Sequence, residues 1–98
     1  MNLRHFLAWA ETQGRLVRIE QPADPHLEMA RLIHARQEQP LLFTDPQRPG
    51  WQVAAGVCAR REHFAWALDA DAAGIVPRLI AALRRPSPPI QVAHAPCQ

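Results

Sequence analysis

Residues that could hold a metal ion occur in two short stretches of this 98-residue chain. Cys58 and His63 form one pair, and His94 and Cys97 form the other. Zinc sites need thiolates and imidazoles that converge, usually from two tight ligand pairs. The second pair has a workable spacing, but Cys58 and His63 straddle the boundary between an expected strand and an expected helix. We therefore predict ordinary thiols and solvent-facing histidines, with a zinc site as the alternative.

Nucleophilic catalysis has few candidate residues. Ser87 is the single serine, and it lies in a proline-rich stretch. His26 and His34 share one predicted helix, but a histidine acts as a general base only beside a nucleophile. The four glycines are scattered, so no glycine-rich phosphate loop is visible. From the residues alone we identify no catalytic, cofactor-binding or metal-binding residue.

All eleven basic residues are arginines. Four of them form two adjacent pairs, at 60–61 and 84–85. We expect these pairs to be solvated or bonded to nearby acids such as Glu62, with a docking surface as the alternative. Three tryptophans are candidates for the core, and one left exposed would mark a partner interface. These are Trp9, Trp51 and Trp66.

Size and composition limit the classes of protein to which this chain can belong. Its length allows one domain with a modest core, and 48% hydrophobic residues is typical of a globular protein. The net charge of +2 comes without a basic stripe, so we expect no nucleic-acid partner. No apolar run approaches the roughly 18–20 residues that span a bilayer, and the N-terminus does not resemble a secretory signal. We predict a cytoplasmic protein with free thiols and no membrane association.

The first twenty residues predict a helix followed by a strand. Asn2 can cap a helix whose apolar residues recur at helical spacing, and Gly14 suits the left-handed turn that often ends a helix. Residues 15–20 place arginines among β-forming residues and predict a short strand.

Residues 25–37 predict a second helix. Asp24 is a good N-cap, and Pro25 fits the first helical position because its missing N–H costs nothing there. Pro40 prevents the helix from continuing. Its expected buried residues are Met29, Leu32 and Ile33.

The second half of the chain predicts two strands, two helices and a final strand. Residues 40–44 and 51–59 are typical of strands, and small residues along one face of the second strand indicate that a helix packs close there. Residues 60–70 and 75–85 predict helices, and a strand at 90–93 follows a proline-rich linker. The apolar stripes of these helices comprise Phe64, Ala67 and Leu68, and then Ile75, Val76, Leu79, Ile80 and Leu83.

This order of elements predicts a small α/β (α+β) domain. Its mixed β-sheet should have 3–4 strands, and about four helices should cover it. A strand at 90–93 without a partner would leave an open sheet edge, which invites association. A homo-oligomer is therefore kept as an alternative.

Four stretches of the chain, taken in order, form a recognisable pattern. The first contains Gly14, Leu16 and Ile19, which fit a G-x-L-x-x-I/V strand, and then Asp24, Pro25, Leu27, Glu28 and Ala30, which fit a D-P-x-L-E-x-A helix start. This stretch resembles the opening of the UbiD family of prenylated-FMN-dependent decarboxylases, which are 3-octaprenyl-4-hydroxybenzoate carboxy-lyase-like and typically open with a helix followed by these two motifs.

The other three stretches continue the resemblance. "PLLFTD" at 40–45 is similar to the family's "ALLFEN" strand, and "RRPSPPIQVAHAPCQ" at 84–98 is similar to its linker and strand. The chain departs from the pattern at Cys58, Ala59 and His63, where phenylalanine, glycine and arginine are usual. The helix after the third strand matches at Arg61, Glu62, Ala65, Ala67 and Leu68.

The resemblance implies a UbiD-like N-terminal α/β domain at 1–85. Residues 86–98 would then be a proline-rich linker and terminal strand that lead into a catalytic split-barrel domain. In the family, prenylated FMN, its metal ions and the catalytic residues belong to that following domain. The chain itself is therefore expected to bind no cofactor.

The family's reaction is the reversible decarboxylation of aromatic or α,β-unsaturated carboxylic acids. By resemblance, this chain is a non-catalytic domain or accessory small subunit of such a lyase, with a catalytic UbiD-like chain or domain as partner. This predicts an unusually apolar surface near the C-terminal segment. The alternatives are a free-standing protein-interaction module with the same fold and an independent small enzyme.

Overall fold

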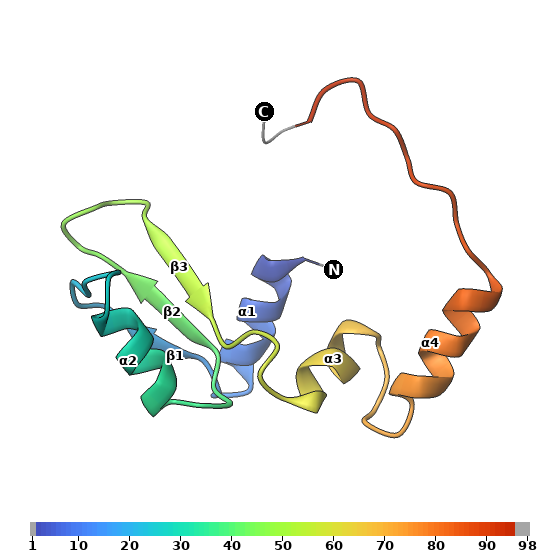
Figure 1. Cartoon of the computed structure of the whole chain (residues 1–98), viewed down its shortest axis with the longest axis horizontal. Helices are drawn as coiled ribbons and strands as arrows, with labels where there is room; N and C mark the ends of the chain where they lie inside the picture. Colours follow the sequence, from blue (N-terminus) through green and yellow to red (C-terminus); the bar gives the residue numbers. More distant parts are fainter. Residues whose placement is uncertain (1, 96–98) are drawn as a thin grey trace.

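The computed structural model describes residues 2–95, which form four helices and one three-stranded sheet (Figure 1). The sheet contains parallel and antiparallel pairs, which confirms the predicted α+β fold class. The predicted order of elements is also confirmed up to the last helix. The elements are α1 (Leu3–Thr12), β1 (Val17–Ile19), α2 (Glu28–Ala35), β2 (Leu41–Thr44), β3 (Gln52–Ala55), α3 (Arg61–Ala67) and α4 (Ile75–Arg84).

β2 is the central strand of the sheet. It pairs in parallel with β1, where Leu41 lies opposite Val17, and antiparallel with β3, where Leu41 lies opposite Ala55. The parallel pair needs the crossover through α2, whereas residues 45–50 return the chain directly into β3. Residues 41–43 are all buried, as expected for a strand covered on both faces.

α2 covers one face of the sheet and forms the main core with it. Met29 of α2 is buried against Leu41 and Phe43, whose side chains point to the same face because they are two residues apart. The expected burial of Leu32 and Ile33 is confirmed in part, since both pack half-buried against this core. Val17, Ile19, Ala23, Trp51, Val53 and Ala55 complete the cluster.

α1 lies on the opposite face. The side-chain oxygen of Asn2 accepts a hydrogen bond of 3.0 Å from the backbone N–H of His5, so the predicted N-cap is confirmed. Leu7 of α1 borders the same hollow as Leu42 and Ala54, which point away from α2. α1 therefore lies on the side of the small residue Ala54, as predicted, but an open hollow separates the two.

α2 begins three residues later than predicted. The carboxylate of Asp24 accepts a hydrogen bond from the backbone N–H of His26 at 2.8 Å, and Glu28 accepts one from the N–H of Asp24 at 2.9 Å. These bonds close a turn over residues 25–27, and the helix starts only at Glu28. Asp24 thus caps the preceding turn and not the helix, because its side chain reaches the nearer N–H.

The C-terminal part of the chain extends away from the sheet. α3 and α4 lie beyond its edge, and residues 86–95 form an extended tail that curves back from α4 (Figure 1). The radius of gyration is 16.6 Å, compared with about 13 Å for a compact domain of this size. The C-terminal part therefore does not close onto the core.

The predicted strand at 90–93 is wrong for this chain. The structure has no strand there, and 91% of Ile90 is exposed. A strand forms only where its backbone N–H and C=O groups meet a second strand. The tail runs clear of β1, β2 and β3, so residues 90–93 find no such partner among residues 2–95 (Figure 1).

Candidate functional site

α1 and α3 meet in an aromatic cluster. Phe6 is buried and lies edge-on to His63 and to Trp66, with ring centroids 5.2 Å and 5.6 Å away. Trp9 stacks on Trp66 at 5.1 Å. None of the three tryptophans is fully exposed, and Trp51 packs on the main core instead. All three tryptophans are therefore partly buried against other residues of the described chain.

His63 contradicts the prediction of a solvent-facing histidine. Only 2% of it is exposed, and its Nδ1 accepts a hydrogen bond of 3.3 Å from the backbone N–H of Arg60 at the start of α3. Its Nε2 is buried without a partner among the described residues. Burial lowers the pKa of His63, and the charge of Arg60 lowers it further, while Glu62 opposes the shift. The neutral imidazole is therefore favoured here.

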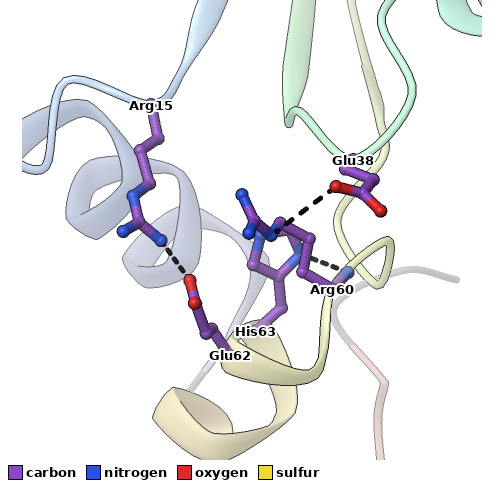
Figure 2. A network of polar contacts seen from close by, with 5 residues as sticks. All are labelled: Arg15, Glu38, Arg60, Glu62 and His63. Carbon is purple, nitrogen blue, oxygen red and sulfur yellow. Dashed lines mark hydrogen bonds and ion pairs between the residues drawn. The ribbon is translucent and has the colours of Figure 1, made fainter.

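Two ion pairs surround this histidine (Figure 2). Glu62 pairs with Arg15, which lies after α1, and Arg60 approaches Glu38 at 4.0 Å. The paired arginines are exposed, and Arg60 approaches an acid, as predicted, but that acid is Glu38, because the fold brings Arg15 beside Glu62. The hydrogen bond from Arg15 holds the pKa of Glu62 below its usual range. These pairs link α3 to the segments that follow α1 and α2.

Gly56 sets the path of the chain from β3 toward α3. Its φ is +69°, in the left-handed region that favours glycine. A Cβ atom there would overlap the carbonyl oxygen of Gln39. The backbone of the segment after β3 can therefore pass directly beside the segment before β2.

The residues considered for metal or nucleophilic chemistry do not come together. Cys58 and His94 are exposed, and Cys97 lies outside the described residues. His26, His34 and Ser87 are also exposed. Within residues 2–95, no group of three or more His, Cys, Asp or Glu side chains could hold a metal ion.

An apolar groove lies between α3 and α4. Its volume is about 520 Å³, and it is open to solvent. Phe64 and Leu68 of the α3 segment line one wall, and Ile75 and Leu79 of α4 line the other. Cys58, Ala59, Arg60, Arg61 and Ala67 complete the lining.

The apolar stripe of α4 continues outward from this groove. Ile75 is buried, but Val76, Leu79, Ile80 and Leu83 are 53%, 47%, 46% and 81% exposed. We call these four residues the α4 face. Counted with two tail residues, Ile90 and Val92, they make up six of the nine exposed large hydrophobic residues. The apolar surface predicted near the C-terminal segment is therefore present. None of the four described helices is long and apolar enough to cross a bilayer.

Comparison with protein families identifies this architecture. The sequence profile of the 3-octaprenyl-4-hydroxybenzoate carboxy-lyase N-terminal domain matches residues 7–83. The chain belongs to this family. The family region includes the whole sheet, α2, α3, α1 from Leu7 onward and α4 except Arg84.

Two solved structures of UbiD-class enzymes are similar to this family member. One is an evolved dimeric form of HmfF from Pelotomaculum thermopropionicum in complex with prFMN, at 33% identity and a TM-score of 0.78. The other is HmfF from the same organism in complex with FMN, at 34% identity and a TM-score of 0.76. Each match covers 88% of this chain but only 20% of the HmfF chain.

The described residues of this domain do not fit a metal-bound flavin phosphate. Metal ions that bridge phosphates prefer oxygen ligands, above all carboxylates. The apolar groove has arginines at its rim but no carboxylate or imidazole in its lining, and residues 2–95 contain no cluster of metal ligands elsewhere. We therefore assign no cofactor chemistry to these residues.

Proposed function

We propose that this chain is the non-catalytic N-terminal domain, or an accessory small subunit, of a UbiD-type decarboxylase. It would act beside a catalytic domain that binds prenylated FMN and its metal ions, in the cytoplasm. The substrates would be aromatic or α,β-unsaturated carboxylic acids. One observation carries this proposal: the chain aligns over 88% of its length with only 20% of a UbiD-class enzyme that holds prFMN.

The arrangement of the residues supports a scaffolding role. The ionisable groups with shifted pKa values, Glu62 and His63, are engaged in packing α1 against α3. The exposed thiol and histidines are dispersed over the surface. The α4 face is apolar surface that the described chain leaves uncovered, and such surface is suited to binding a protein.

Reconstitution tests this function. The chain would be co-expressed with the prenylated-flavin polypeptide of the same genome, whether that polypeptide is encoded separately or downstream in the same gene. Release of carbon dioxide from aromatic and α,β-unsaturated acids would be measured for each part and for the mixture. We expect turnover only with the catalytic polypeptide and a higher rate when both are present. Flavin binding or turnover by this chain alone would contradict the proposal.

A free-standing interaction module is the second candidate, and the exposed α4 face is the observation that favours it. Such a module would bind a protein without any effect on decarboxylation. In the same experiment it would leave the rate of the catalytic polypeptide unchanged and would not co-purify with it.

A further inference from the structure

We propose that the α4 face and the adjoining α3–α4 groove dock onto a protein surface that is apolar at its centre and acidic at its rim. The proposed partner is the catalytic polypeptide, so this inference rests on the proposed function. Beyond the proposed function, it specifies which surface of this domain contacts the partner and which chemical groups the contacting surface of the partner should carry.

The α4 face leaves large apolar side chains exposed to solvent. A helix of a globular domain normally buries such a stripe, yet here only Ile75 is buried. The stripe leads into a concave groove, and Phe64 is 47% exposed in its opposite wall. A concave apolar site accepts a protruding side chain or helix of a second protein.

The charges around this surface indicate which charges the partner should carry at the rim of the contact. Up to Asp71 the chain has eight arginines and nine acidic residues, whereas it has three arginines and no acid beyond that position. Arg84 lies beside the apolar stripe at the end of α4, Arg85 follows it, and Arg78 lies on the side of the helix that faces away from the stripe. None of the three takes part in an ion pair within residues 2–95. A surface rimmed by carboxylates is the complementary one.

The same charges argue against a second copy of this chain as the occupant. Two α4 faces packed together would bring their arginines close without an acidic residue from α4 or the tail to offset them. A membrane surface is also a poor match, because the site is concave and α4 carries no aromatic residue. A protein partner is consistent with the comparisons, since 80% of the length of HmfF has no counterpart in this chain.

The experiment measures binding of the full chain to the co-expressed catalytic polypeptide. Leu79→Glu/Leu83→Glu places negative charges in the centre of the surface. Arg84→Glu/Arg85→Glu reverses the sign of the charge at two positions of its rim. Leu27→Glu is the matched control for the first, because Leu27 is 63% exposed in the turn before α2. Arg31→Glu/Arg36→Glu, at exposed positions in and after α2, controls for the second. Circular dichroism and urea unfolding of each variant establish that it folds.

We expect Leu79→Glu/Leu83→Glu to weaken binding by at least about tenfold, since central apolar contacts dominate interface energies. The rim reversal should weaken it several-fold at low salt and less at high salt, because salt screens exposed charges. Both controls should bind as the parent does. If the parent binds and Leu79→Glu/Leu83→Glu binds equally well, this inference fails while the proposed function stands. If the catalytic polypeptide does not bind the parent at all, the proposed function fails and this inference with it.

Two further arms test the other occupants. Light scattering of the chain alone should show a monomer, and a dimer that Leu79→Glu/Leu83→Glu dissociates would assign the surface to a second copy. Vesicles of phosphatidylcholine and phosphatidylserine should leave the chain in the supernatant. Sedimentation with vesicles that depends on Leu79 and Leu83 would assign the surface to a membrane. Either of these results would overturn the inference.

Discussion

α3 has two sides with different surroundings. On one side, His63 is buried and joins Trp66 in the aromatic cluster with α1, and the Arg15–Glu62 pair lies beside this cluster. On the other side, Phe64 faces a groove that α4 leaves open. Both sides carry apolar residues, so composition alone does not explain the difference. The α1–α3 junction is complete within the chain, whereas the α4 face presents apolar surface with nothing among the described residues to cover it.

This comparison separates residues that hold the domain together from residues that remain available for a partner. Substitutions in the α1–α3 junction should lower the free energy of unfolding and leave the chemistry of the α4 face unchanged. Substitutions on the α4 face should change the free energy of unfolding only a little and should alter the surface that is available to a partner. The predictions below test this division, beginning with the largest expected effect.

Phe6→Ala should be the most damaging single change. Phe6 is 6% exposed and contacts the rings of Trp9, His63 and Trp66, so its loss leaves a cavity between α1 and α3. We expect a loss of about 3–5 kcal/mol in the free energy of unfolding, measured by urea denaturation. Leu79→Ala is the matched change on the α4 face and should cost about 1 kcal/mol or less, because the side chain is half-exposed. Equal losses at both sites would contradict the division.

Gly56→Ala should have the next largest effect. The left-handed backbone alone disfavours alanine by about 1–2 kcal/mol, and the overlap of the new Cβ with the carbonyl of Gln39 adds to this. Gly50→Ala is the control, because Gly50 also has a positive φ but open space around it. A shift in the midpoint of urea unfolding that is no larger for Gly56→Ala than for Gly50→Ala would show that the close approach is unimportant.

His63 should make the domain less stable in mild acid. Its folded-state pKa lies below the ordinary value of 6.5, so the unfolded chain binds the proton more readily. Stability is then fully present above pH 6.5 and declines as the pH falls from 6.5 toward the folded-state pKa. Urea unfolding between pH 8 and pH 5 measures this decline. The range stays above 4.5, so it excludes most of the titration of Glu62, whose stabilising ionisation is lost only at lower pH.

His63→Gln should flatten this dependence on pH. A glutamine side chain can still accept the hydrogen bond from the N–H of Arg60, as in an ordinary capping box, but it does not titrate. His34→Gln, at an exposed position, is the control and should keep the parent slope. An unchanged slope in His63→Gln would show that another group causes the acid sensitivity.

The Arg15–Glu62 pair should give the smallest effect. Both side chains are nearly half-exposed, so water and salt screen their attraction. A double-mutant cycle with Arg15→Gln and Glu62→Gln should give a small favourable coupling that decreases as salt is added. A coupling that is independent of salt would show that the pair acts through packing and not through charge.

Much of the local structure was predictable from the sequence. The Asn2 cap, the order of the helices and a strand within 40–44 are encoded by neighbouring residues and were confirmed. The start of α2 was predicted too early because the Asp24 side chain competes for the nearest backbone N–H. The strand at 90–93 was wrong because a strand needs a second strand, which its own residues do not specify.

The candidate site depended more strongly on the tertiary structure. The sequence determined that 75–85 would form a helix with one apolar stripe, because helical periodicity is a property of consecutive residues. It also carried the motifs by which the family is identified. Only the tertiary structure decided that His63 is buried, that Glu62 meets Arg15 and that the α4 face stays open. Burial and pairing depend on which distant segments arrive beside a residue, and local spacing does not contain that information.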